Sequence, residues 1–239
     1  MPPHPARAAY FLDFDGCLVA IAPRPDAVVI PRGLVQMLDR LYHRAGGALA
    51  LVSGRAIADL QGFLPGLNVP MVGCHGAEHA RGRGRVTRLR VDRDILAQAI
   101  AALHAAAGPV PGFLVEVKPV SVGLHYRANP ALEPEAEAIM GRIAKAAPGF
   151  HLHQSKQMIE LRPDGADKGQ AVAKLLSEAS FQGRCPVVMG DDLTDEPAFA
   201  QANRRGGVSV KIGQGATAAR HRLRDPQQVR HWLNIWGAS

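Results

Sequence analysis

An apolar run that stops abruptly at two aspartates is the feature that most constrains how this chain folds. Ala8–Asp13 reads AAYFLD, a stretch with the length and composition of a buried strand, and Phe14-Asp15-Gly16 follows directly. Alternate residues of an extended chain point the same way, so the Asp13 and Asp15 side chains are expected to converge on one site. Neighbouring carboxylates repel each other unless a cation or a proton lies between them. Two aspartates in an ordinary surface turn are the alternative, which their place after an apolar strand disfavours.

Strand-like and helix-like segments alternate over both ends of the chain, which predicts parallel strands joined by helical crossovers. The predicted strands after the first are 48–52, 69–73, 186–189 and 208–212, and the predicted helices are 34–45, 56–64, 168–179, 195–202 and 227–236. The middle differs: it predicts a polar hairpin at 77–90, helices at 92–107 and 133–147, and paired strands within 113–127 and 150–162. We therefore expect an α/β core domain from residues 1–78 and 163–239, with an inserted α+β domain at 79–162.

Composition narrows the class of protein and its partners. The 239 residues carry 28 basic and 21 acidic side chains, a formal net charge of +7, and include the segment RGRGR at Arg81–Arg85. Neither aromatic stacking residues nor a nucleic-acid-binding motif accompanies the arginines, so we expect a solvated basic surface that helps gather small anions. Three scattered cysteines predict reduced thiols rather than a disulfide framework. With no signal-like or membrane-spanning segment, the expected location is the cytoplasm, with no membrane partner.

Two further polar segments follow predicted strands, at the edge where parallel α/β sheets bind their ligands. Ser53-Gly54-Arg55 offers a hydroxyl and a backbone N–H to a phosphoryl oxygen beside a helix start. Gly190-Asp191-Asp192-Leu193-Thr194-Asp195-Glu196 places four acids within six residues, a pattern suited to Mg²⁺, which prefers oxygen ligands. Helix capping explains Asp195 and Glu196 better than it explains Asp191.

The order of Asp13-x-Asp15-Gly16, Ser53, Lys168 and Gly190-Asp191-Asp192 resembles the haloacid dehalogenase superfamily of phosphotransferases. Further segments resemble signature blocks of trehalose-6-phosphate phosphatases: Gly73–Glu78, Val115–Lys118, His125–Arg127, and Glu160–Pro163 leading to Lys168. The resemblance spans about residues 8–232 and implies a Rossmann-like (Rossmannoid) haloacid-dehalogenase-like parallel-sheet core with an inserted α+β cap domain that sets substrate specificity. Cys17 departs from the family, which usually has threonine there, and a small loss of loop order is the expected consequence.

The resemblance also implies roles for the core residues. Asp13 would attack phosphorus to form an aspartyl-phosphate, and Asp15 would protonate the departing sugar oxygen and then deprotonate water. Mg²⁺ would lie between the Asp13 carboxylate, the Asp15 backbone carbonyl and Asp191, with Asp192 as a further metal ligand or positioning residue. Ser53 and Lys168 would stabilise charge on the transferring phosphoryl group.

Recognition of trehalose hydroxyls is assigned by the same resemblance to charged residues of the cap. These residues are Glu116, Lys118, Arg127, Lys156 and Glu160. In the core, Gly54, Arg55 and His75 are the expected substrate contacts, with a turn or core histidine as the alternative for His75. The alternative for the cap charges is a solvated face of a small sheet.

The expected function is therefore Mg²⁺-dependent hydrolysis of trehalose 6-phosphate, with a functional link to a trehalose-phosphate synthase. Two alternatives stay open. A capped phosphatase for another sugar phosphate should lack the set Glu116, Lys118 and Arg127. A non-catalytic nucleic-acid-binding or regulatory module should have lost a nucleophile or a metal ligand.

Overall fold

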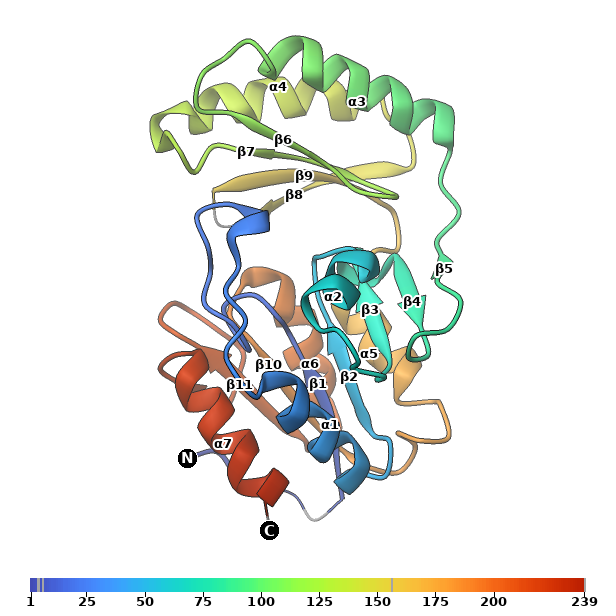
Figure 1. The fold of residues 1–239 in the computed structure, drawn as a ribbon. Coiled ribbons are helices and arrows are strands. Elements are labelled where there is room, and N and C mark those ends of the chain that lie inside the picture. The colour runs from blue at the N-terminus through green and yellow to red at the C-terminus, as the bar shows by residue number, and fades with distance from the viewer. Residues whose placement is uncertain (4, 6, 156, 239) are drawn as a thin grey trace. The chain divides into compact units, whose positions relative to one another are not determined.

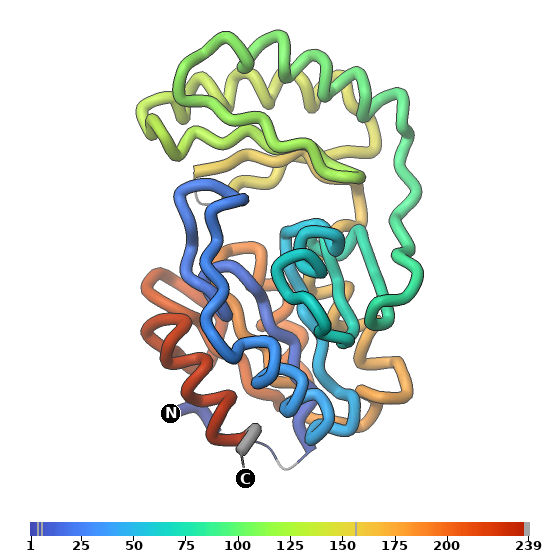
Figure 2. Tube along the Cα trace, in the orientation of Figure 1, coloured from blue at the N-terminus to red at the C-terminus, as the bar shows by residue number. Residues whose placement is uncertain are grey.

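The chain forms two compact units in the computed structural model, which describes residues 1–3, 5, 7–155 and 157–238. The core unit comprises Met1–Thr87 and Asp167–Ser239, and the inserted unit comprises Arg88–Ala166. Both junctions fall later in the chain than the expected boundaries at 78/79 and 162/163. The reason at the first junction is that strand β4 (Glu78–Ala80) pairs with β3 (Met71–Gly73) and so extends the core sheet. In Figure 2 both ends of the chain belong to the core unit, where Trp232 Nε1 donates to the carbonyl oxygen of Pro2 at 2.9 Å.

The core unit is built on a sheet of eight strands among the described residues, in the order β12-β11-β10-β1-β2-β3-β4-β5. The strands from β12 to β3 are parallel, and β4 runs antiparallel to β3. The bounds of the strands besides β4 are β1 (Ala8–Leu12), β2 (Leu49–Val52), β3 (Met71–Gly73), β5 (Thr87–Arg88), β10 (Cys185–Gly190), β11 (Val208–Ile212) and β12 (His221–Leu223). β12 and the short β5 complete this order at its two edges.

Helices cover both faces of this sheet, which explains why its strands are continuous apolar runs rather than alternating ones. Helices α1 and α7 pack together, and so do α5 and α6 on the other face (Figure 1). The helices of the core unit are α1 (Leu34–Arg44), α2 (Ile57–Phe63), α5 (Lys168–Leu175), α6 (Glu196–Arg204) and α7 (Pro226–Ala238). All five residues of β1 are buried, in agreement with the prediction of a buried strand from AAYFL. The predicted α/β fold class is confirmed.

The inserted unit is an antiparallel sheet covered on one face by two helices. Its strands run in the order β6-β7-β9-β8, and α3 and α4 pack on the sheet (Figure 1). The bounds are α3 (Arg93–Ala107), β6 (Leu114–Val117), β7 (Val122–His125), α4 (Glu133–Lys145), β8 (Phe150–Ser155) and β9 (Met158–Pro163). Val122 and Leu124 of β7 join the core beneath the helices, so Gly123 and His125 lie on the opposite face, which carries charged side chains.

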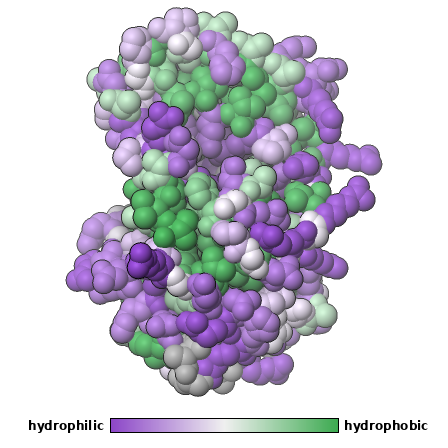
Figure 3. All heavy atoms as spheres, viewed as in Figure 1, coloured by the Kyte–Doolittle hydropathy of each residue, from purple (hydrophilic) through white to green (hydrophobic). Residues whose placement is uncertain are grey.

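Hydrophilic residues predominate on the face shown in Figure 3, with hydrophobic residues in separate patches. Within the described part of the chain, none of the helices has both the length and the apolar character that crossing a membrane requires.

Candidate active site

Three of the motifs identified in the sequence meet at one edge of the core sheet. β1 pairs in parallel with both β2 and β10, so the C-terminal ends of these strands are neighbours. Asp13 follows β1, Ser53 follows β2 and Asp191 follows β10. Parallel α/β sheets bind ligands at this edge. Asp13, Ser53 and Asp191 therefore follow the C-terminal ends of adjacent parallel strands, and their roles in one site stay predictions.

Three buried carboxylates and one buried ammonium group form the centre of this edge. Asp13, Asp191 and Asp195 each offer an oxygen, and these oxygens all lie within 4.8 Å of one another. Lys168 Nζ, at the start of α5, lies 3.0 Å from Asp13 Oδ1 and 2.7 Å from Asp195 Oδ1. The centre therefore holds three carboxylates against the Lys168 ammonium group, and a second buried ammonium group, Lys211, contacts the backbone of Asp191. This charge imbalance and this donor set fit a divalent cation with oxygen ligands.

The same arrangement shifts the ionisation of its members. Burial raises the pKa of Asp13 well above its ordinary value, and Asp195 and Asp191 add to this effect, whereas Lys168 opposes it. Burial alone would lower the pKa of Lys168, but Asp13 and Asp195 outweigh it, so the pKa of Lys168 is raised and the group is protonated. The centre is consequently a site that stabilises added positive charge.

The Asp191 carboxylate lies against a glycine that no other residue can replace without a shift. Gly16 has φ +70°, and a Cβ built on it would lie 2.2 Å from Cγ of Asp191. The backbone carbonyl oxygen of Asp191 accepts a hydrogen bond from Nζ of the buried Lys211, at 2.7 Å. Gly16 thus contacts the side chain of Asp191, and Lys211 holds its backbone.

Asp195, rather than Asp192, lies with Asp13 and Asp191 in the acidic centre, and the expected role of Asp192 as a further metal ligand or positioning residue stays a prediction. Asp192 and Asp195 form a capping box across the 3-10 turn Leu193–Asp195, in which the Asp192 N–H donates to Asp195 Oδ2 at 3.0 Å. Asp192 therefore caps the turn, while Asp195 caps it and also contacts Lys168. In the sequence, helix capping already explained Asp195, so nothing there indicated its contact with Lys168.

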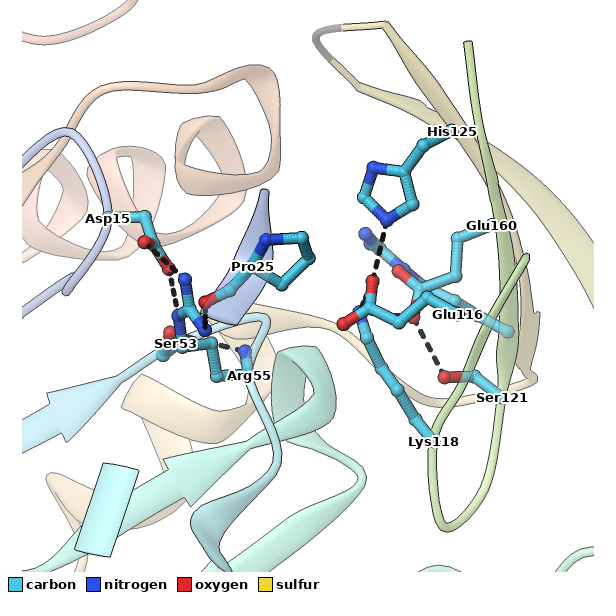
Figure 4. Close-up of polar contacts among 10 residues, drawn as sticks. Asp15, Pro25, Ser53, Arg55, Glu116, Lys118, Ser121, His125 and Glu160 are labelled. Atoms are coloured by element: carbon cyan, nitrogen blue, oxygen red, sulfur yellow. Dashed lines mark hydrogen bonds and ion pairs between the residues drawn. The ribbon is translucent and has the colours of Figure 1, made fainter. Parts of the chain in front are cut away.

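Arg55 is paired with Asp15. Its Nε and Nη2 donate to the two carboxylate oxygens of Asp15 at 2.6 and 2.9 Å, and its Nη1 donates to the carbonyl oxygen of Pro25 at 2.8 Å (Figure 4). The Arg55 backbone N–H donates to the hydroxyl of Ser53 at 3.2 Å, and Ser53 is fully buried. The structure thus brings Ser53, Arg55 and Asp15 together, with Arg55 orienting the Asp15 carboxylate through a bidentate pair.

His75 and Gly54 lie against each other. A Cβ on Gly54 would come within 2.4 Å of the His75 ring, and the His75 backbone N–H donates to the carbonyl oxygen of Ser53 at 3.0 Å. His75 is buried and has a left-handed backbone conformation, with φ +57°. His75 therefore belongs to the loop that supports Ser53, and its expected contact with substrate stays a prediction.

A second polar cluster lies in the inserted unit, on the face of its sheet opposite to helices α3 and α4. Glu160 is fully buried and accepts hydrogen bonds from Lys118 Nζ at 2.9 Å, Ser121 Oγ at 2.8 Å and Arg162 Nε at 2.7 Å. Figure 4 shows Ser121 pointing to Glu160 from the neighbouring strand region. In the register, Gly123 of β7 stands between Glu116 and Glu160, and the Met158 side chain packs against it. Glu160 consequently organises this cluster.

Glu116 is the more accessible acid of the cluster. Its Oε2 lies 2.8 Å from His125 Nε2 and 3.7 Å from Lys118 Nζ (Figure 4). Burial raises the pKa of Glu116, but the hydrogen bond to His125 and the charge of Lys118 outweigh burial, so the pKa is lowered overall. Glu116 is therefore a carboxylate at neutral pH.

The structure says less about the two other residues that were expected to contact the sugar. Arg127 lies in a turn beyond the end of β7 and is partly buried, and Lys156 lies outside the described residues. Ser121 and Arg162 also belong to this cluster, although neither was among the site residues expected from the sequence. Arg162 had a usable signal, because it stands two residues after Glu160 on a strand and therefore shares its face.

The fold is the one found in haloacid dehalogenase-like hydrolases. A haloacid dehalogenase-like hydrolase from Bacteroides thetaiotaomicron has the same fold, with a TM-score of 0.68 at 15% identity over 96% of this chain and 99% of that one. The sequence pattern of the trehalose-phosphatase family matches residues 11–227. The chain belongs to the trehalose-phosphatase family, so the predictions of family and of a phosphomonoester hydrolase are confirmed.

Individual relatives agree with this assignment. The trehalose-6-phosphate phosphatase of Escherichia coli K12 is 42% identical over 234 residues, which cover 96% of this chain and 86% of the relative. The crystal structure of a trehalose-6-phosphate phosphatase related protein aligns with a TM-score of 0.81 at 27% identity, over 95% of this chain and 96% of that one.

Proposed function

We propose that the chain hydrolyses trehalose 6-phosphate to trehalose and phosphate, with Asp13 as the nucleophile. The observation that carries this proposal is the buried contact of Asp13 with Lys168, inside a group of three carboxylates that follow parallel strands. Family membership and the 42% identical E. coli phosphatase support the substrate. A functional link to a trehalose-phosphate synthase, whose product this enzyme would consume, stays a prediction, as does the cytoplasmic location.

Asp13, Asp191 and Asp195 are the residues that would hold Mg²⁺, together with the backbone carbonyl of Asp15. The fit rests on three buried carboxylates, which outnumber the two neighbouring ammonium groups of Lys168 and Lys211, and on the glycine cradle for Asp191. When bound, the ion would offset the repulsion between these carboxylates and the incoming phosphate.

The reaction then follows from the protein's own groups. An Asp13 carboxylate oxygen forms a bond to phosphorus as the bond from phosphorus to the sugar oxygen breaks, and Asp15 donates a proton to that oxygen. Ser53 and Lys168 stabilise negative charge on the phosphoryl oxygens. In the second step Asp15 takes a proton from water, the water oxygen bonds to phosphorus, and the bond to Asp13 breaks. Arg55 orients Asp15 through the bidentate pair before substrate arrives.

The charged cluster of the inserted unit is the proposed source of sugar specificity. Glu116 and Lys118 present a carboxylate and an ammonium group to sugar hydroxyls, while Glu160 holds Lys118 in place. A phosphatase for another sugar phosphate is the nearest alternative. Phosphate release from a panel of sugar phosphates, with Mg²⁺ and with a chelator, tests both: the proposal requires Mg²⁺-dependent release with a clear preference for trehalose 6-phosphate.

Mg²⁺ is expected to stabilise the folded chain against heat, independently of turnover. At a free concentration about 100 times the dissociation constant, a bound ion contributes about 2.7 kcal/mol. For a chain of this size that corresponds to a rise of roughly 5–10 °C in the thermal midpoint. Differential scanning calorimetry with Mg²⁺ and with a chelator measures it. Asp191→Ala should abolish the rise, whereas Asp164→Ala, an exposed acid of the inserted unit, should keep it. Equal midpoints for the wild type with and without Mg²⁺ would exclude the metal assignment.

Glu116→Ala is expected to lower kcat/KM for trehalose 6-phosphate by one to two orders of magnitude. Charge-assisted hydrogen bonds contribute about 1.5–3 kcal/mol each, and about 1.4 kcal/mol corresponds to a tenfold effect. Hydrolysis of a small aryl phosphate should change little, because it has no sugar to contact. Glu137→Ala, on α4, is the matched control and should leave kcat/KM unchanged for both substrates. Equal losses on both substrates would show that Glu116 supports the fold rather than specificity.

A further inference from the structure

A basic cavity of the core unit remains unused by the proposed reaction. It has a volume of about 420 Å³ and lies beside the first residue of β3, Met71, whereas the catalytic residues follow the ends of strands. Pro70, which is partly exposed, contributes apolar surface above the buried Met71 and Leu175, and the RGRGR segment contributes Arg81 and Arg85. A second cavity of about 330 Å³ shares Arg81 and Glu178 with it. Volumes of this size are typical of sites for small molecules.

The charged groups around this cavity are mostly cationic. Arg81, Arg85 and Lys174 line it, with Glu178 as its acidic side chain. Glu178 pairs with Arg81, at 3.3 Å between Oε2 and Nε. Among the residues that the structure describes, no carboxylate pairs with Arg85 or Lys174. The cavity therefore has a net positive charge that its own acid does not neutralise.

The hairpin that carries the two arginines is held in shape by specific contacts. Gly82 has φ +67°, and a Cβ on it would lie 2.2 Å from Oδ1 of Asn68. The same Oδ1 accepts a hydrogen bond from the Arg83 backbone N–H at 2.9 Å, and Thr87 Oγ1 donates to the carbonyl oxygen of His79 at 3.2 Å. The backbone of the hairpin is thus arranged before any ligand binds, which reduces the entropy lost on binding.

We propose that this cavity binds a small molecule that carries a phosphate group on a ring-shaped body. Guanidinium groups recognise phosphate oxygens through paired hydrogen bonds, and an ammonium group adds a point charge. The flat apolar ring of Pro70, which is partly exposed, suits the body of such a ligand. The site is separate from the catalytic centre: α5 begins at Lys168, and Lys174 lies about 9 Å further along the same helix. The proposal does not depend on the catalytic assignment.

Isothermal titration calorimetry of the full chain tests it, in the presence of a chelator so that turnover is suppressed. Adenosine 5′-monophosphate is the first probe, and inorganic phosphate, which has no ring, is the second. Arg81→Ala/Arg85→Ala should weaken binding of adenosine monophosphate by about tenfold or more, since two charge-assisted contacts are lost. Arg204→Ala/Arg205→Ala removes the same charge from exposed positions outside both cavities and should leave binding unchanged. Glu178→Gln should strengthen binding, because the one repelling carboxylate is removed.

Three results would overturn the proposal. The first is no binding of either probe by the wild-type chain. The second is an equal loss in the two double-arginine variants, which would show a non-specific effect of charge. The third is binding that Ser53→Ala weakens and Arg81→Ala/Arg85→Ala does not, which would place the anion in the catalytic centre. Binding of adenosine monophosphate that exceeds that of inorganic phosphate supports the ring-bearing ligand, and equal affinities would overturn that part of the proposal.

Discussion

Asp13→Asn is expected to lower phosphate release from trehalose 6-phosphate by about 10⁴-fold or more, the scale of effect seen when a nucleophile is removed. An amide neither attacks phosphorus nor contributes charge to the acidic centre. The buried position of Asp13 beside Lys168 prevents solvent from substituting for it easily. Steady-state phosphate release with Mg²⁺ measures the effect.

The matched control for this variant is Asp39→Asn, which makes the same chemical change on the surface helix α1 and should retain full activity. Binding of trehalose 6-phosphate to the Asp13 variant, measured by calorimetry, should persist, because the sugar contacts are untouched. Phosphate release by Asp13→Asn within tenfold of wild type would show that the covalent mechanism is wrong.

Lys168→Met is expected to impair both catalysis and stability. Loss of a charge that stabilises the transferring phosphoryl group should lower kcat by about 10²–10³-fold. Removal of one partner of a buried ion pair costs about 3–5 kcal/mol, which corresponds to roughly 6–20 °C in the thermal midpoint. Lys145→Met, at the exposed end of α4, is the matched control and should change neither quantity.

The loss of stability in Lys168→Met should depend on pH in a defined direction. Lys168 is the group that lowers the pKa of Asp13, so without it this pKa rises further. The folded variant then retains a proton that the unfolded chain releases near the ordinary aspartate pKa of about 4. Because the folded state binds more protons in this range, its stability falls as pH rises. Thermal midpoints in chelator should therefore differ from wild type more at pH 8 than at pH 5. Identical differences at both pH values would contradict this account of the centre.

The strands of the core and the polar residues that follow them were predictable, because each is marked by a short run of neighbouring residues. The run AAYFL followed by aspartates marks a strand that is buried on both faces and its polar C-terminal end, and parallel pairing then places such ends along one edge. Ser53 and Asp191 were selected for the same reason. The junctions between the two units were less predictable, since strand Glu78–Ala80 joins the core sheet through hydrogen bonds to β3 that its short polar sequence does not signal.

The sequence by itself determined the fold class through the periodicity of its apolar residues and the family through its motifs, and the family resemblance then named Asp13 as the candidate nucleophile. Only the tertiary structure decided that Asp195 rather than Asp192 joins Asp13 and Asp191, and that Arg55 pairs with Asp15. It also decided that Glu160 is fully buried among Lys118, Ser121 and Arg162. The physical reason is that each of these contacts joins side chains by direction and burial. Neighbours in the sequence, such as Asp191 and Asp192, carry identical carboxylates but point to different partners once the turn that holds them is formed.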